Sequence, residues 1–186
     1  LGNINFNHSI IDNFFYISID QDSQEIMAPI LNQYEGKIKY SSLKLEKSFD
    51  FGKWTLDNSI IYQIINQNED ILNLPQFMSR NTLFFSERIF RNTLAIQTGL
   101  NFKIFSKYYA NEYNPLISDF HIQNQKKIGS FPLFDFFFNA KIRQTKIFII
   151  AEHINSSFTG NNFYSTPESV YRDFGVRFGL KWNLFN

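Results

Sequence analysis

The residues that come nearest to a reaction centre are Glu152 and His153, which stand close to Asn155 and Ser156. A Ser-His pair is the basis of one class of hydrolase. Consecutive residues of a strand point to opposite faces of a sheet, however, so Glu152 and His153 would point away from each other there. The sequence also lacks the G-x-S-x-G motif of that class. We therefore predict that this chain is not an enzyme.

The sequence gives no indication of a metal or cofactor site. It contains no cysteine, which excludes disulfides and thiolate metal ligands. The acidic segment with Asp20, Asp22 and Glu25 lacks the glycine and the terminal glutamate of an EF-hand calcium loop. The net charge of +1 provides no electrostatic basis for binding nucleic acid. We predict no cofactor, no bound metal and no nucleic-acid partner.

The clearest pattern is an alternation of side chains near the end of the chain, over residues 174–184. Large apolar residues occupy every second position, and glycines or polar residues occupy the positions between them. In a strand this order gives one apolar and one polar face. Ordinary strands have about five or six residues, whereas a tilted strand that crosses a bilayer needs about 9 to 11. We predict the closing strand of an outer-membrane β-barrel.

The composition favours the same fold. Aromatic residues make up 18% of the chain, with 23 phenylalanines, yet the mean hydropathy is −0.25. A soluble domain must bury so much aromatic surface, whereas a barrel displays it to lipid and keeps a polar lumen. No apolar run approaches the roughly 18 residues of a membrane-spanning helix.

Eight further segments have the pattern of strands, at 1–7, 14–19, 37–49, 54–65, 81–90, 94–105, 133–143 and 146–155. Long connections are predicted at 20–36, 66–80, 108–132 and 157–172, and all five prolines lie in them. Proline is excluded from central strands, which supports this division. Outer-membrane barrels have short periplasmic turns, so the long connections are assigned to the extracellular side. A change of apolar parity within 37–49 predicts a bulge near Ser41 and Ser42.

The predicted fold class is therefore all-β, an antiparallel transmembrane β-barrel of the outer-membrane type. Nine strands are an odd number, whereas single-chain bacterial barrels have an even number. The sequence also begins without an initiator methionine or a signal segment. We infer that residues 1–186 are the C-terminal strands of a larger barrel. The alternative is a small eight-stranded barrel with Leu1 to Asn7 outside it.

The alternation assigns a face to each polar residue. If the apolar face meets lipid, the lumen is lined by Asp57, Gln97, Lys103, Asp135, Lys141, Arg177 and Lys181. Basic members outnumber acidic ones, which favours the passage of anions. The alternative is that these residues form a network in which they pair with one another inside a plugged or narrow barrel. Aromatic belts at the two interfaces are predicted from Trp54, Tyr62, Phe174, Trp182 and Phe185.

Three segments carry a resemblance to a known family, and they read KYYANEYNP (107–115), FHIQNQKKIGSFPLFDFFFNAKIRQTKIFIIAEHIN (120–155) and FTGNNFYSTPESVYRDFGVRFGLKWNLF (158–185). They resemble the outer-membrane barrels called putative porins in Bacteroidetes-type bacteria. The resemblance implies a β-barrel in the outer membrane and a diffusion channel, and it supplies no catalytic motif. Such porins are considerably longer than this chain.

The sequence thus predicts passive diffusion of small hydrophilic solutes through an outer-membrane channel of a Gram-negative bacterium. The alternative is a non-conducting barrel that serves as a structural or accessory subunit of a larger outer-membrane assembly. The expected partners are outer-membrane lipid, other outer-membrane proteins, and the barrel-insertion machinery, which would recognise the C-terminal strand.

Overall fold

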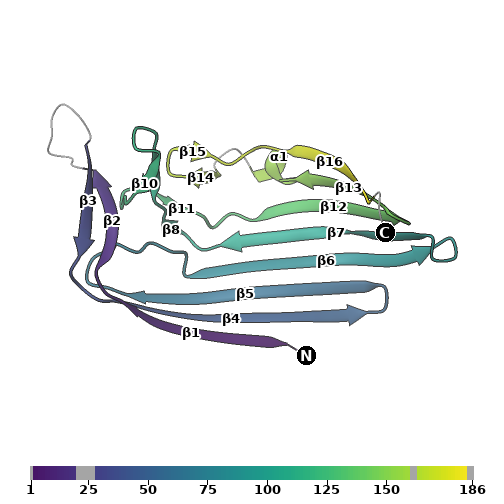
Figure 1. Cartoon of the computed structure of the whole chain (residues 1–186), viewed down its shortest axis with the longest axis horizontal. Coiled ribbons are helices and arrows are strands. Elements are labelled where there is room, and N and C mark those ends of the chain that lie inside the picture. The colour runs from purple at the N-terminus through teal and green to yellow at the C-terminus, as the bar shows by residue number, and fades with distance from the viewer. Residues whose placement is uncertain (1, 20–27, 160–162, 184–186) are drawn as a thin grey trace.

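Long strands joined in antiparallel order form one large sheet, which dominates the computed structural model of the chain (Figure 1). The structure describes residues 2–19, 28–159 and 163–183. In spatial order the strands of the large sheet are β1 (Asn3–Ile11), β4 (Ile38–Phe51), β5 (Trp54–Asn66), β6 (Phe77–Ile89), β7 (Leu94–Phe105), β12 (Leu133–Ile142), β13 (Thr145–Glu152) and β16 (Gly175–Trp182). Each strand pairs with the next member of this order, which also follows the order of these eight strands along the chain. The predicted all-β, antiparallel fold is confirmed.

Short turns join the strands at one end of the sheet, and long connections join them at the other (Figure 1). We call these the turn end and the loop end. Gly52 and Lys53 alone connect β4 to β5, and Gly52 has a φ of 68°. Two-residue hairpin turns require positive φ, which glycine adopts without steric cost. Arg143, at 51°, has a positive φ in the turn between β12 and β13.

The expected count of nine strands in one sheet is wrong, because the large sheet has eight in the part of the chain that the structure describes. Residues 14–19 form β2 (Phe14–Ile19), which pairs with β3 (Pro29–Tyr34) in a separate hairpin at the loop end (Figure 1). β3 lies in the predicted loop 20–36, of which residues 20–27 are outside the described part. β1 pairs with β4 over its whole length, which leaves no place for β2 between them.

The count of eight removes the odd number from which a missing strand was inferred. It also corrects the alternative that placed residues 1–7 outside the barrel, because Asn3–Ile11 is a full member of the sheet.

The pairing of β4 is regular, so the bulge expected near Ser41 and Ser42 is absent from this described strand. Ile38 and Tyr40 lie on the otherwise polar face of the sheet. Ile38 is fully buried there, because loop-end residues pack over it. An apolar residue is therefore accommodated on the polar face where loop-end residues pack over it and exclude water.

The predicted long connections contain short strands of their own. Within 108–132, β8 (Tyr108–Tyr109) pairs with β11 (Lys127–Ile128), and β9 (Glu112–Asn114) pairs with β10 (Asp119–His121). Within 157–172 the helix α1 (Ser156–Thr159) ends, and β14 (Tyr164–Thr166) pairs with β15 (Ser169–Val170). The connection predicted at 66–80 is shorter, since β6 begins at Phe77. No helix in the described ranges is long and apolar enough to cross a membrane.

The buried apolar residues lie on one face of the sheet, at the loop end. One cluster joins Ile38 to Tyr34 and Ile71, and another joins Leu133 to Phe131 and Phe163. The opposite face has no such cluster among the described residues. Its apolar side chains are exposed instead, and Phe178 on β16 is 84% accessible. A large apolar face without cover is the sign of a surface that meets lipid or a partner.

The sheet is open in the described residues, so the closed barrel of the prediction is not present in this structure. The edge strands β1 and β16 each have one neighbour. Each edge therefore presents a row of backbone N–H and C=O groups that are available for further pairing.

Candidate functional site

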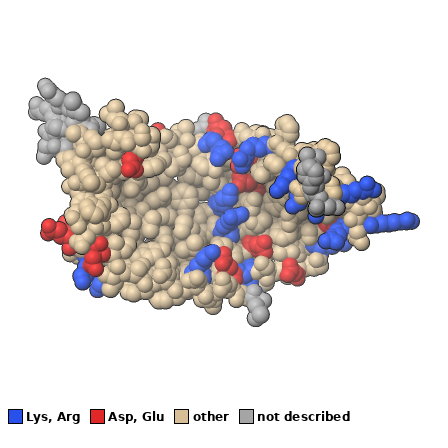
Figure 2. Space-filling view, viewed as in Figure 1, with Lys and Arg blue, Asp and Glu red and all other residues tan. Residues whose placement is uncertain are grey.

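The candidate site is the face of the sheet that carries the charged side chains. Register places all seven predicted lumen residues on this face, which we call the polar face. The ladder shows it directly, because Asp57 pairs with Thr82, Thr82 with Asn101, and Asn101 with Asp135. Charged side chains gather across the sheet and toward the turn end in Figure 2.

The polar face is mainly basic. Its strands carry eight basic residues, Lys44, Arg80, Arg88, Lys103, Lys141, Lys146, Arg177 and Lys181, against five acidic ones, Glu46, Asp50, Asp57, Asp135 and Glu152. The positive excess predicted from four basic and two acidic candidates is therefore present in the full set.

Near the loop end, the charges of this face are organised as ion pairs. The Lys103 ammonium lies 2.6 Å from a carboxylate oxygen of Asp135, whose side chain is buried. The other oxygen of Asp135 accepts a hydrogen bond of 3.0 Å from the backbone N–H of His153. Glu152 accepts hydrogen bonds from Arg172 at 2.9 Å and from Arg177 at 2.5 Å. These contacts tie the connection after β13 to the polar face.

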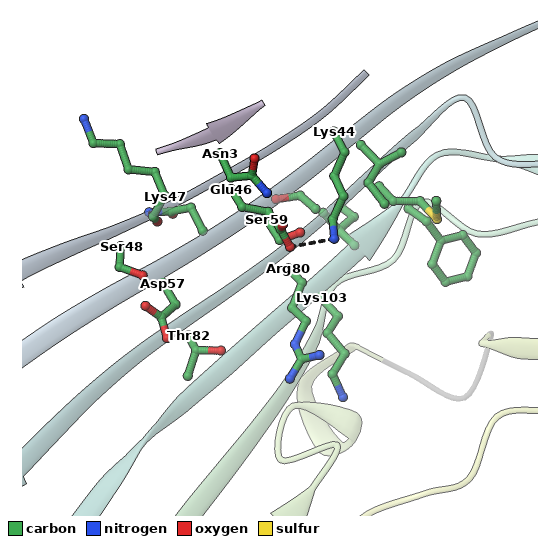
Figure 3. A pocket seen from close by; sticks show the side chains of 16 residues that line it. Asn3, Lys44, Glu46, Lys47, Ser48, Asp57, Ser59, Arg80, Thr82 and Lys103 are labelled. Carbon is green, nitrogen blue, oxygen red and sulfur yellow. Dashed lines mark hydrogen bonds and ion pairs between the residues drawn. The ribbon is translucent and has the colours of Figure 1, made fainter. Parts of the chain in front are cut away.

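A hollow of about 770 Å³ opens on the polar face over β4 to β7 (Figure 3). Lys44 and Glu46 form an ion pair of 2.6 Å on one side of it. Arg80 and Lys103 lie side by side on the other, with Arg80 directly opposite Lys103 across the β6–β7 ladder. Arg80 has no ion pair within the described chain. The hollow is therefore lined by paired and unpaired charge together.

An apolar layer crosses the polar face nearer the turn end. Phe84, Phe137 and Ile150 occupy one row of the ladder, and Phe148 lies in the next row. The Phe148 ring covers Gly179, where a Cβ atom would lie 2.4 Å from Cζ of the ring. The expectation that large apolar side chains avoid the polar parity is thus wrong in this layer. Residues of β13 were already apolar on both parities in the sequence.

Beyond this layer, four basic residues line the turn end of the polar face. Lys141 on β12 lies opposite Lys146 on β13, and Lys146 lies opposite Lys181 on β16. Arg88 shares the row through Ala95. None of the four basic side chains has an ion pair or hydrogen bond with the described residues. We call Arg88, Lys141, Lys146 and Lys181 the basic row.

The loop end of the polar face is covered by aromatic side chains. Phe131 packs against Phe163 with ring centroids 4.4 Å apart, and against Phe105 of β7 at 5.6 Å. His153 is buried between Phe163 and Tyr171, and its Nδ1 donates to the carbonyl of Arg172 at 2.8 Å. This geometry makes His153 a packing residue of the loop.

Of the predicted belt residues, Trp54, Tyr62 and Trp182 lie on the opposite, apolar face, and Phe174 directly precedes β16. Trp54 and Trp182 stand at the turn end, while Tyr62 and Phe174 stand at the loop end, and all four are exposed. Eight residue steps separate Trp54 from Tyr62, or about 27 Å along the strand at about 3.4 Å per residue. A tilt of about 40° reduces this to about 21 Å, near the apolar band of about 25 Å in outer-membrane barrels. Phe185 lies outside the described residues.

A comparison with protein families matches the whole chain, residues 1–186, to the family described as "Putative porin". The chain belongs to this porin family. Neither the curated proteins nor the solved structures give a match to it. The resemblance first noted in the C-terminal half thus extends over the N-terminal half of this porin-family chain.

Several basic residues of the polar face were missed in the porin-family sequence. Lys146 was missed because its strand is apolar on both parities in the sequence, so that no face was assigned to its residues. The turn also lies one residue earlier than expected, at Arg143 and Gln144, which sets Lys146 opposite Lys141 instead of Arg143. The positive φ of Arg143, which favours a two-residue turn, has no distinct signal in the sequence.

The strand β6 carries two consecutive charged residues, Glu87 and Arg88, which must lie on opposite faces of the sheet. Arg88 faces the polar side, while Glu87 faces the apolar side and forms an ion pair with Lys53 in the adjacent turn. Glu87 therefore lies close enough to the turn end for its carboxylate to reach a lysine outside the apolar band.

Proposed function

We propose that this porin-family chain forms part of an outer-membrane channel for passive diffusion of small hydrophilic solutes. The observation that supports it is the contrast between the two faces of one sheet. The apolar face is uncovered and flanked by aromatic residues, and the polar face carries charge and hollows. In an outer-membrane barrel the first face contacts lipid and the second encloses water.

In this proposal the sheet closes into a barrel. The free edges of β1 and β16 require partners in a membrane, because unpaired backbone groups are costly in lipid. Further strands of a longer chain would satisfy both edges, as expected for the C-terminal part of a larger barrel. A barrel of about 16 strands leaves an aqueous channel, whereas about eight strands enclose an interior filled by side chains.

The channel would prefer anions, since basic residues exceed acidic ones on the polar face. We place the protein in the outer membrane of a Gram-negative bacterium, with lipid on the apolar face. Recognition by the barrel-insertion machinery would involve β16 and the residues after it. We assign the chain no catalytic role.

A non-conducting structural or accessory barrel is the second candidate, and a specific observation favours it. Aromatic packing around Phe131 covers the loop end of the polar face, and the ion pairs of Asp135 and Glu152 fix the connection after β13 there. A plug of this kind would close a narrow barrel and present its loops to other outer-membrane proteins.

Single-channel recording separates the two candidates. The full-length protein, extracted folded in detergent, is added to a planar bilayer with a salt gradient across it. The channel proposal predicts discrete ohmic steps and a reversal potential on the anion-selective side. Correctly folded protein that inserts without conducting would contradict it and support the accessory role.

A further inference from the structure

The basic row at the turn end has a charge arrangement that disfavours folding when nothing is bound. Lys141, Lys146 and Lys181 lie on three adjacent strands, each directly opposite the next. Neighbouring strands are about 4.8 Å apart, and like charges placed directly opposite each other destabilise a sheet. A row of three lysines therefore needs a compensating negative charge.

The described chain does not supply that charge on the polar face, and Glu87, which also lines the hollow, has the apolar parity and is paired with Lys53. The nearest acidic residues on the polar face of these strands are Asp135 and Glu152, each six residues from the row. Six residues correspond to about 20 Å along a strand. Both carboxylates already have partners, Asp135 with Lys103 and Glu152 with two arginines.

The row lines a hollow that is large enough for a small ligand. Its volume is about 680 Å³, and Arg88, Lys141, Lys146 and Lys181 all contribute to its lining. Gln97 and Asn139 lie in the adjacent row of the same hollow, with the Asn139 amide 3.4 Å from the Gln97 side-chain oxygen. These amides add neutral hydrogen-bonding groups beside the charged ones.

We propose that the basic row binds a small multivalent oxyanion of the phosphate type. Each lysine offers three N–H donors without an acceptor among the described residues, and lysine binds phosphate as a point charge. Two or more negative charges on one ligand compensate several lysines at once, which a single chloride does not. The inference deepens the proposed function and rests on it in one respect, namely that the polar face meets water.

A lipid phosphate would offer the same chemistry, but its position argues against it. The basic row lies on the polar face, whereas lipid is expected on the face that carries Phe178 and Leu180. We therefore assign the site to a soluble anion.

The test is isothermal titration of sodium pyrophosphate into the full-length protein, folded in a neutral detergent at about 0.1 M salt. Saturable binding is expected for the native protein. Lys146→Gln, at the centre of the row, should weaken it about tenfold or more, because the ligand loses a hydrogen bond to a charged group. Arg91→Gln removes the same charge from a turn at the same end but outside the row, and should bind as the native protein does.

The controls keep the result decisive. Folding of each variant is checked by its heat-dependent mobility on gels, and Lys141→Gln serves as a second variant if Lys146→Gln does not fold. Absence of saturable binding, or an equal loss in Arg91→Gln, would overturn the inference. Displacement of pyrophosphate by micelles that contain phosphatidylglycerol would also overturn it, in favour of a lipid headgroup.

Conductance distinguishes this failure from failure of the proposed function. Channels that conduct but bind no pyrophosphate would refute the anion site and leave the porin role intact. Pyrophosphate binding by a protein that does not conduct would support the site and contradict the channel.

Discussion

At the scale of single residues, parity decides which solvent each side chain meets. Leu100 and Asn101 are neighbours near the middle of β7 and lie on opposite faces. Leu100 is 43% accessible on the uncovered apolar face. In the proposed channel, a one-residue difference in position would therefore separate a lipid-facing site from a water-facing one.

This difference predicts unequal effects of the same new charge. Leu100→Lys should lower the free energy of unfolding by about 2 to 4 kcal/mol, the cost of a lysine at the bilayer midplane. Asn101→Lys should lower it less, because the new charge lies on the polar face and only the hydrogen bond that Asn101 accepts from Thr82 is lost. Urea unfolding of the protein folded into lipid vesicles measures both variants. Equal destabilisation would contradict the assignment of the faces.

The buried Asp135 leads to a second residue-scale prediction. Asp135→Asn removes the charge that balances Lys103 and weakens the anchor of the connection after β13. We expect a loss of about 1 to 3 kcal/mol and faster proteolysis within residues 163–172. Asp57→Asn is the matched control, since Asp57 is on the same face and has no ion pair within the described chain. The role of Asp135 as an anchor would be refuted by equal proteolysis in both variants.

At the scale of elements, the contact between β13 and β16 depends on the glycines of β16. A side chain at Gly179 would overlap the Phe148 ring, whereas a Cβ at Gly175 would meet no atom within 4 Å. Gly179→Val should therefore destabilise the protein by about 1 to 3 kcal/mol, as overpacking usually does. Gly175→Val, on the same strand and face, should be close to neutral. The same unfolding measurement applies, and a larger loss in Gly175→Val would refute this packing.

The elements also show what the sequence could and could not predict. All eight strands of the large sheet overlap segments that were predicted from the local pattern of the sequence, because the two faces of a sheet have opposite preferences for apolar and polar residues. The exceptions to these preferences lie where a side chain has another contact. Ile38 carries the wrong parity because the loop cluster covers it, and Phe148 does so because it packs on Gly179.

The pairing partners of strands that are distant in the chain could not be predicted from the sequence either. Residues 14–19 alternate like a membrane strand, but their partner is β3, and Ile17 accepts a backbone hydrogen bond from Ile122 at 2.8 Å. Nothing in the local pattern distinguishes this hairpin from a strand of the large sheet. Lys146 was missed for another reason, since its strand is apolar on both parities and its period therefore assigns no face.

At the scale of the whole molecule, the polar face is layered from the loop end to the turn end. Aromatic loop packing comes first, followed by ion pairs, an apolar layer and the basic row. The apolar face has aromatic residues at both ends and no cover in the described residues. In the proposed channel, the layered polar face lines a water-filled lumen across the membrane, and the apolar face contacts lipid.

Cysteine accessibility tests this claim most directly, because the chain contains no native cysteine. Thr82 lines the polar hollow, and its neighbour Leu83 lies on the apolar face. The two variants Thr82→Cys and Leu83→Cys are reconstituted in lipid vesicles and treated with a charged, membrane-impermeant thiol reagent. The account predicts rapid modification of the first and protection of the second. Equal modification of both, or faster modification at position 83, would contradict it.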